Sequence, residues 1–230
     1  MTQHDPATAP EASATAGPSA AGTSGSSAAG PAAEEAAPGT RPRRRSTATD
    51  IALIATFAAL IAVCAILPAI SVGGLVPITL QTFGVILAGA VLGARRGFLA
   101  VLLYLAVGAI GLPVFAGGSA GLAPFAGPSA GYLVAMPLAA LLCGFIVERL
   151  PRTKVAASVP LVFAAGFVSS IVFIHPLGAL GMSWLGGLTL QQAFIADLAF
   201  WPGDVVKNLL VGIVATAVHR AFPALLPRRR

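Results

Sequence analysis

Long apolar runs separated by short polar or glycine-rich segments dominate the chain from residue 51 to residue 222. A helix needs about 20 apolar residues, within a range of about 17–25, to cross the hydrocarbon core of a bilayer. Six runs meet or approach this length, although the third is short: 51–70, 78–94, 97–112, 129–148, 155–175 and 204–222. The pattern predicts an all-α integral membrane protein built as a bundle of six transmembrane helices.

Composition divides the 230 residues into three parts. Residues 1–50 are rich in Ala, Pro, Gly, Ser and Thr, which predicts a disordered cytoplasmic tail. Residues 51–222 form the expected membrane domain, and residues 223–230 a short basic tail. The membrane domain carries ten charged side chains: Arg95, Arg96, Glu148, Arg149, Arg152, Lys154, Asp197, Asp204, Lys207 and Arg220. Ten charges could not cover the surface of a soluble domain of this size, which excludes a cytosolic globular enzyme.

The placement of Lys and Arg predicts the orientation in the membrane. With the N-terminus in the cytoplasm, 13 of the 14 Lys and Arg residues lie in or beside inner segments, and the outer loops 71–77, 113–128 and 176–203 hold none. Both termini are therefore expected in the cytoplasm. The Arg41–Arg45 cluster indicates an orientation signal that also attracts anionic lipid. The alternative is that it forms an arm that binds nucleic acid or a partner.

The last outer loop carries further membrane signals. Residues 190–200 carry both apolar side chains, among them Phe194, Ile195, Leu198 and Phe200, and the polar side chains Gln191, Gln192 and Asp197, as a short amphipathic helix on the outer surface would. Trp184 and Trp201 fit aromatic anchors at the membrane interface. His175 and His219 stand isolated at span ends, and Cys64 and Cys143 are expected to pack as apolar residues.

Asp204 and Lys207 are the strongest candidates for a ligand site. They lie three residues apart in Trp201-Pro202-Gly203-Asp204-Val205-Val206-Lys207, so they share one helix face at the outer end of the sixth span. Ionisable residues within a membrane cost a few kcal/mol and by default indicate a site. The alternative is that they pair with each other and only stabilise packing.

Two further segments offer polar or flexible groups on the outer side. Thr79 and Gln81 begin the second span, where the amide of Gln81 needs a polar partner or a ligand. The segment 113–128 includes Gly117 and Gly118, which suit close approach to a ligand or simply a flexible loop. Gly117–Gly121 also matches the G-x-S-x-G pattern around Ser119, with His175 as the only outer-side base. That motif needs a preceding strand and a following helix, which argues against the alternative of a serine hydrolase.

The first span carries small residues that recur on one side: Ala52, Ala55, Ala58, Ala59 and Ala62. Small side chains let helices approach closely in lipid. They serve either a partner interface or packing inside the bundle.

Four separated stretches together resemble the BioY family, the biotin-binding S components of energy-coupling factor (ECF) transporters. These are Val76–Gly97, Leu103–Ala116, Gly127–Tyr132 and Pro202–Lys207, and the resemblance covers about residues 51–222. It implies a non-enzymatic six-helix subunit in the plasma membrane that takes up biotin from the outer face. It also implies partnership with a coupling transmembrane protein and two ATPase subunits, although some members are reported to work alone.

The resemblance gives the candidate residues definite roles. Asp204 would accept from the ureido N–H groups of biotin, Lys207 would donate to its ureido carbonyl or carboxylate, and Gln81 could do either. Thr79 would offer a hydroxyl, Gly117 and Gly118 would let the backbone approach the ligand closely, and Tyr104, Phe115 and Tyr132 would form apolar walls, with two tyrosine hydroxyls. The first-span residues Ala55, Ala58, Ala59 and Ala62 would contact the coupling protein. No cofactor and no nucleic acid is expected in this chain, because ATP would be hydrolysed by the partner subunits. A six-helix carrier for another vitamin is the main alternative.

Overall fold

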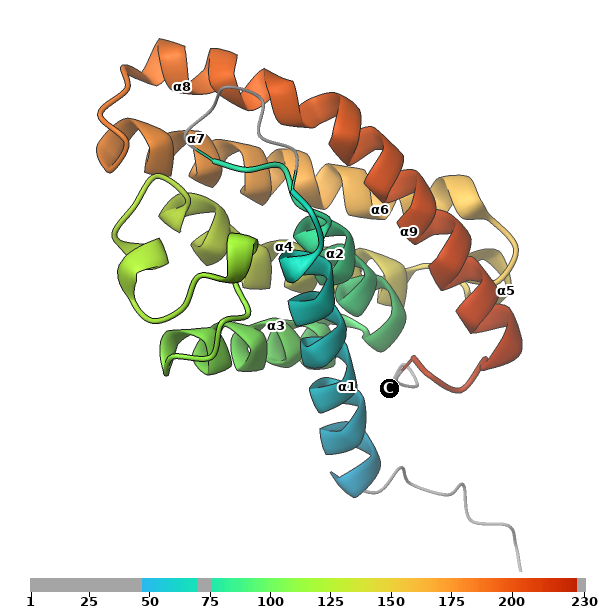
Figure 1. Ribbon diagram of the computed structural model, residues 1–230. Helices are drawn as coiled ribbons and strands as arrows, with labels where there is room; N and C mark the ends of the chain where they lie inside the picture. Colours follow the sequence, from blue (N-terminus) through green and yellow to red (C-terminus); the bar gives the residue numbers. More distant parts are fainter. Residues whose placement is uncertain (1–46, 70–75, 227–230) are drawn as a thin grey trace, which may run out of the picture. The chain divides into compact units, whose positions relative to one another are not determined.

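The computed structural model describes residues 47–69 and 76–226. Within them the chain is helical, with no β-strand (Figure 1). The helices are α1 (Thr47–Ile66), α2 (Gln81–Leu92), α3 (Ala94–Ala109), α4 (Ala130–Arg149), α5 (Arg152–Val155), α6 (Val159–Ser169), α7 (His175–Trp184), α8 (Leu190–Asp197) and α9 (Trp201–Ala221). Three short 3-10 turns, η1 (Ala116–Gly118), η2 (Ala123–Phe125) and η4 (Leu198–Phe200), and one π turn, η3 (Ser170–Ile174), complete the list. Most of the tail predicted over residues 1–50, with its Arg41–Arg45 cluster, lies outside the described residues, as do residues 70–75 and 227–230.

Four helical stretches in the described part of the chain are long and apolar enough to cross a membrane. They are α1, α4, the continuous run Val159–Trp184 formed by α6, η3 and α7, and the continuous run Leu190–Ala221 formed by α8, η4 and α9. The helices α2 and α3 are shorter, with 12 and 16 residues. The prediction of an all-α fold is therefore confirmed over the described residues, in which four helical stretches have the length and composition of membrane spans.

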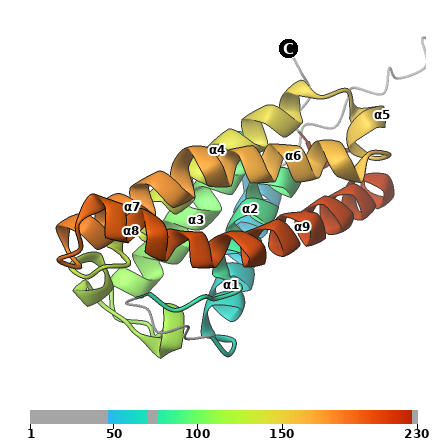
Figure 2. The ribbon, with the colours of Figure 1, turned by 90° about the horizontal axis from the view of Figure 1, so that it is seen from above.

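The last two helical runs are longer than the sequence pattern predicts. The segment 176–203, expected as a loop, is helical apart from the link between Trp184 and Leu190. The short amphipathic helix predicted over residues 190–200 does form, but it continues directly into α9 instead of lying as a separate surface helix. Figure 2 shows the two runs lying side by side as an antiparallel hairpin. Thr189 begins the second run with a capping box, in which its side chain accepts from the Gln192 backbone N–H and Gln192 accepts from the Thr189 N–H.

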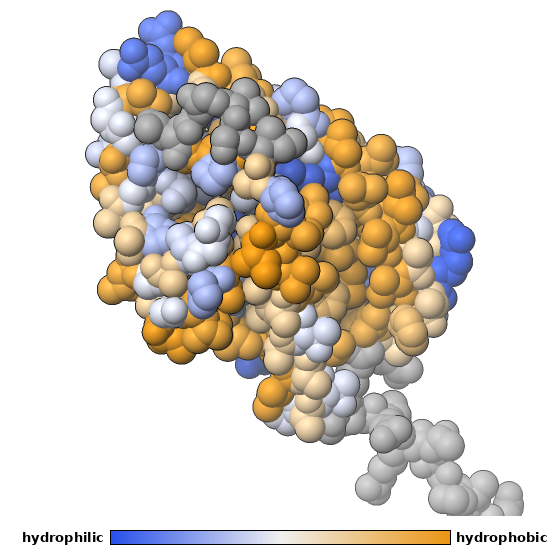
Figure 3. All heavy atoms as spheres, viewed as in Figure 1, coloured by the Kyte–Doolittle hydropathy of each residue, from blue (hydrophilic) through white to orange (hydrophobic). Residues whose placement is uncertain are grey.

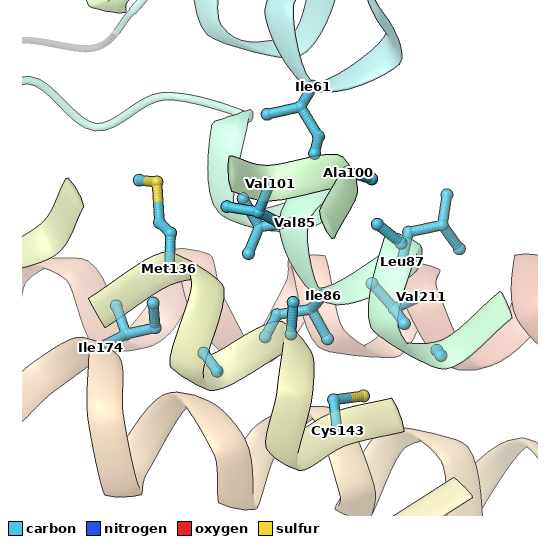
Figure 4. Close-up of a cluster of buried hydrophobic side chains, with 14 of the residues drawn as sticks. Ile61, Val85, Ile86, Leu87, Ala100, Val101, Met136, Cys143, Ile174 and Val211 are labelled. Carbon is cyan, nitrogen blue, oxygen red and sulfur yellow. The ribbon is translucent and has the colours of Figure 1, made fainter. Parts of the chain in front are cut away.

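Helix α2 occupies the centre of the bundle. Ten of its 12 residues are buried, because α1, α3, α4, α6 and α9 all pack against it. After Gln81 and Thr82 its sequence is apolar on every side, as expected of a fully enclosed helix. Figure 4 shows Val85 and Ile86 of α2 within the cluster of apolar side chains that the neighbouring helices contribute.

Glycines allow α2, α3 and α4 to lie close together. A Cβ added at Gly89 of α2 would overlap the backbone carbonyl of Ala140 in α4, and one at Gly144 would overlap the backbone of Ala94. Gly93 links α2 to α3 with a φ of 85°, which is a conformation that glycine adopts without strain. The Glu148 carboxylate accepts from the Ala94 N–H at 2.9 Å and thereby satisfies a free donor at the start of α3.

Charged residues gather at one end of the helices. Arg96 donates to Asp50 at 3.2 Å and to the Leu225 carbonyl at 2.6 Å, and Arg152 donates to the Leu226 carbonyl at 2.9 Å. Figure 3 shows an apolar surface over much of the face in view, with hydrophilic residues over the α5 end and the α8 end. Among the described charged residues, three lie away from the α5 end: Asp197, Asp204 and Lys207.

Replacing Gly89 by Ala is expected to destabilise the bundle. The added methyl group meets backbone that cannot rotate away, and overpacking of this kind costs about 1–3 kcal/mol, against about 1 kcal/mol gained in helix propensity. Gly127→Ala is the matched control, since its Cβ would have no neighbour closer than 3.8 Å. Thermal unfolding in detergent should show a midpoint lowered by about 2–8 °C for Gly89→Ala alone. Equal midpoints for both variants would show that α2 and α4 are not held this closely.

Candidate functional site

A cavity of about 320 Å³ lies where the start of α2, the segment 113–129, α4, η3 and α9 meet. This volume falls within the range of about 300–1,000 Å³ that is usual for small-molecule sites. Most of the lining is apolar, and its charged side chains are Asp204 and Lys207. A few polar groups in an apolar wall are what orients a small ligand.

Asp204 and Lys207 form a buried ion pair at the cavity. Lys207 Nζ lies 2.8 Å from Asp204 Oδ1 and donates to Thr82 Oγ1 at 3.1 Å. The Thr82 hydroxyl in turn lies 3.4 Å from Asp204 Oδ1, to which it donates. Asp204 and Lys207 are 3% and 8% exposed. The expectation that the two residues share one helix face is confirmed, and both line the cavity, although their pairing with each other is what the packing alternative expected.

Hydrogen bonding to Tyr104, which lies outside the cavity wall, fixes the side chain of the second predicted polar residue, Gln81. Its Nε2 donates to the Tyr104 hydroxyl at 2.8 Å and approaches the Met136 sulfur at 3.3 Å. The Tyr104 hydroxyl donates to the Val114 carbonyl at 3.1 Å. Gln81 is part of the cavity wall whereas Tyr104 is not, so Tyr104 orients Gln81.

The other predicted site residues divide into two groups. Thr79, Phe115 and Tyr132 line the cavity. Gly117 and Gly118 do not, and their φ angles of 66° and 74° serve to turn the chain between Ala116 and Ser119, which do.

Ser119 has no base beside it. Its hydroxyl donates to the Ala116 carbonyl at 2.9 Å, and the segments before and after it are the 3-10 turns η1 and η2. His175 is bonded elsewhere. The geometry thus gives the G-x-S-x-G match no support as a nucleophile elbow.

Two residues that the sequence analysis left out of the site extend the ion pair into a network. Asp197 lies 1% exposed and accepts from the Tyr132 hydroxyl at 2.6 Å and from Trp201 Nε1 at 3.0 Å. Its other contact is His175 Nδ1, which lies 2.8 Å from Asp197 Oδ2. His175 Nε2 lies 3.5 Å from Asp204 Oδ2. The prediction that His175 is isolated is therefore wrong, because it lies between two buried carboxylates.

The roles expected for the two tryptophans separate in the same way. Trp184 is 80% exposed, as an interfacial anchor would be. Trp201 instead donates to Asp197, and its ring lies 5.0 Å from the ring of His175. Trp201 is thus a part of the network, which corrects its prediction as an anchor.

The π turn η3 delivers His175 to this position. It ends directly before His175-Pro176, and a proline inside a helix cannot donate to the carbonyl four residues earlier and collides with it. A wider turn relieves both problems, and π turns recur at functional sites. Ser170 fixes the turn, because its hydroxyl donates to the Gly166 carbonyl at 3.2 Å and accepts from Asn208 Nδ2 at 3.3 Å.

The small-residue side of α1 is only partly available to a partner. Ala55 and Ala59 are exposed, and Ala62 is half-buried. Ala58 is 7% exposed and packs in the core of the chain itself. Cys64 and Cys143 are buried and unbridged, in agreement with the expected packing role.

Comparison with known proteins shows to which family these features belong. The sequence model of the BioY family matches residues 38–224. The chain is 44% identical over 183 residues to the biotin transporter BioY of Rhizobium etli, with 78% of this chain and 97% of that protein covered. It is 46% identical over 193 residues to the biotin transporter BioY of Rhodobacter capsulatus, with 78% and 98% covered.

A solved structure agrees with the sequence matches. The crystal structure of the S-component for biotin from an ECF-type ABC transporter superposes with a TM-score of 0.70 at 30% identity, covering 77% of this chain and 95% of that one. The similar proteins are transporters and not enzymes. This chain, an all-helical multi-pass membrane protein, belongs to the BioY family.

Proposed function

We propose that this protein takes up biotin across the plasma membrane as the substrate-binding subunit of an ECF-type transporter. The observation that carries the proposal is the buried pair of Asp204 and Lys207 in the wall of a largely apolar cavity, in a chain of this family. The relatives that it resembles over nearly their whole length are biotin transporters.

The chemistry of biotin suits the cavity wall. Biotin has a ureido ring with two N–H donors and one carbonyl acceptor, an apolar thiophane ring and a carboxylate. Asp204 supplies an acceptor for the ureido N–H groups, and Lys207 supplies a donor for the carbonyl or the carboxylate. Phe115 and Met136 offer apolar surface for the ring, and Gln81 adds an amide. A ligand that binds here exchanges its own polar groups for part of the bonding between Asp204 and Lys207.

The binding test is biotin titration of purified, monodisperse protein in detergent. Lys207→Met should weaken binding by about tenfold to a hundredfold, the scale of about 1.5–3 kcal/mol for a charge-assisted hydrogen bond. Asp204→Asn combined with Lys207→Met should abolish binding without leaving an unpaired buried charge.

A matched control removes the ion pair at the other end of the helices. Asp50→Asn with Arg96→Met deletes the 3.2 Å pair far from the cavity and should leave biotin affinity unchanged. Affinity like that of the wild type in the Asp204/Lys207 double variant would refute the site. Tight binding of a different vitamin, with none of biotin, would favour a carrier for that vitamin instead.

The orientation that we propose places the cavity outside and both termini in the cytoplasm, with six spans. The helices α2, α4 and α9 support this orientation. Each carries cavity residues near its first turn, and the last turn of each lies at the end of the bundle where the Arg residues gather. Lys and Arg concentrate on the cytoplasmic side of membrane proteins. Residues 38–224, which match the family, include all the helices that this arrangement uses.

Introduced cysteines test the orientation. In a variant without Cys64 and Cys143, Ser119→Cys should react with a membrane-impermeant maleimide in intact cells. Lys154→Cys, which is equally exposed but lies at the charged end, should react only after permeabilisation. Labelling of Lys154→Cys in intact cells, with labelling of Ser119→Cys only after permeabilisation, would show that the protein has the opposite orientation in the membrane.

The partners that we propose are a coupling transmembrane protein and two ATPase subunits, with no cofactor in this chain. The exposed residues Ala55 and Ala59 of α1 offer a surface that a partner helix can approach closely. Ala55→Trp should therefore leave biotin binding by the isolated subunit intact and reduce ATP-driven uptake several-fold. Val168→Trp places the same bulk at an exposed site on α6 and serves as the control. Unchanged uptake by Ala55→Trp would show that this face of α1 does not contact the coupling protein. Uptake in cells without the ATPase module would show that the chain works alone.

A further inference from the structure

The buried network beside the cavity is unbalanced in charge unless His175 is protonated. Its carboxylates are Asp197 on α8 and Asp204 on α9, each at most 3% exposed, and its one ammonium is Lys207. The remaining titratable group that faces it is Tyr132 of α4, which donates to Asp197 as a neutral hydroxyl. Buried charges are costly unless they are paired, and an imidazolium at His175 would balance two anions with two cations.

The hydrogen bonds of His175 lead to the same conclusion. A carboxylate oxygen only accepts, so His175 Nδ1, 2.8 Å from Asp197 Oδ2, carries a hydrogen. In a neutral imidazole the hydrogen on Nδ1 leaves Nε2 as a lone-pair acceptor. That atom is buried, has no hydrogen-bond partner among the described residues, and faces Asp204 Oδ2 at 3.5 Å. Two acceptors then face each other, whereas a second hydrogen on His175 would turn this contact into a charge-assisted hydrogen bond.

The geometry points to His175 as a positioning residue that is protonated when the ligand is bound and, held by Asp197, sets the Asp204 carboxylate for binding. This inference rests on the proposed function of the cavity. Asp204 has Oδ1 on the side of Lys207 and Oδ2 on the side of His175. When a ligand draws Oδ1 or Lys207 into new bonds, a protonated His175 keeps Asp204 ionised and fixed through Oδ2. A ligand that itself carries a carboxylate adds a further negative charge, which a neutral His175 would leave less balanced.

Several groups fix the position of His175 through its partner Asp197 and through its own backbone. Tyr132 and Trp201 both donate to Asp197, and the π turn η3 ends directly before His175.

Histidine is the ordinary side chain whose charge changes between pH 5 and pH 8. If binding needs the protonated form, affinity for biotin is expected to fall as pH rises, by at most about tenfold per pH unit, which is the limit for one proton.

Trp201 provides a readout of the proton that needs no ligand. The protein has two tryptophans, so Trp184→Phe at the exposed site leaves Trp201 as the only one, with its ring 5.0 Å from that of His175. A change of charge on His175 should alter the emission of Trp201. We expect a step in emission between pH 5 and pH 8.5 that disappears in His175→Gln.

The full experiment compares emission and biotin affinity over the same pH range. His175→Gln should bind biotin with an affinity that no longer depends on pH. His219→Gln is the matched control: His219 is equally buried but bonds to the Ala90 carbonyl near the other end of α9, so both pH profiles should stay as in the parent protein.

Each outcome decides one claim. The inference is supported if the parent protein shows both an emission step and an affinity that falls as pH rises, and if His175→Gln shows neither pH dependence. No emission step in the Trp184→Phe parent, or a biotin affinity that is flat across the range, overturns it. A parent protein that binds no biotin at any pH overturns the proposed function instead, and the emission profile then decides by itself whether His175 takes up the proton.

Discussion

The central constraint on this structure is the presence of ionisable side chains inside an apolar bundle. Asp197, Asp204 and Lys207 are nearly inaccessible, and each would cost several kcal/mol if left unpaired. The bundle meets this cost with short contacts drawn from four different helices: Thr82 of α2, Tyr132 of α4, His175 at the start of α7 and Trp201 of α9. The site and the packing are consequently one arrangement, in which a change to either disturbs the other.

The helices that carry this network are shaped to meet at it. The π turn before His175-Pro176 lets one run continue past a proline, and the run from Leu190 to Ala221 places Asp197, Asp204 and Lys207 along one helix. Gly178 leaves room for the ring of Tyr132, since a Cβ there would overlap it. At the other end of the bundle, glycines bring α2, α3 and α4 together and Arg96 and Arg152 bond to the carbonyls of residues 225 and 226. The buried polar network thus lies at one end of the bundle, and most of the other described charged residues lie at the opposite end.

Local signals predicted much of this, and tertiary contacts account for what they missed. Apolar length placed the first four helices to within a few residues, and the rarity of charge in the membrane domain singled out Asp204 and Lys207. The helix over residues 190–200 was predicted, with the Thr189-x-x-Gln192 capping signature at its start, but its continuation into α9 was missed because Gln and Pro lower the hydropathy of this segment. Once that helix is continuous, Asp197 lies seven residues, or two turns, before Asp204 on the same face. The role of His175 depends on contact between two helical runs, which no pattern along one run reveals.

The most direct measurement is an experimental structure of the protein with biotin bound. The ligand is expected in the cavity beside α9, with one of its polar atoms about 2.7–3.2 Å from the Asp204 carboxylate and another at that distance from Lys207 Nζ. His175 is expected to stay within hydrogen-bond distance of Asp197. Biotin bound elsewhere, or bound in the cavity with the Asp204–Lys207 pair unchanged and without polar contact to it, would contradict the claim that this buried pair recognises the ligand.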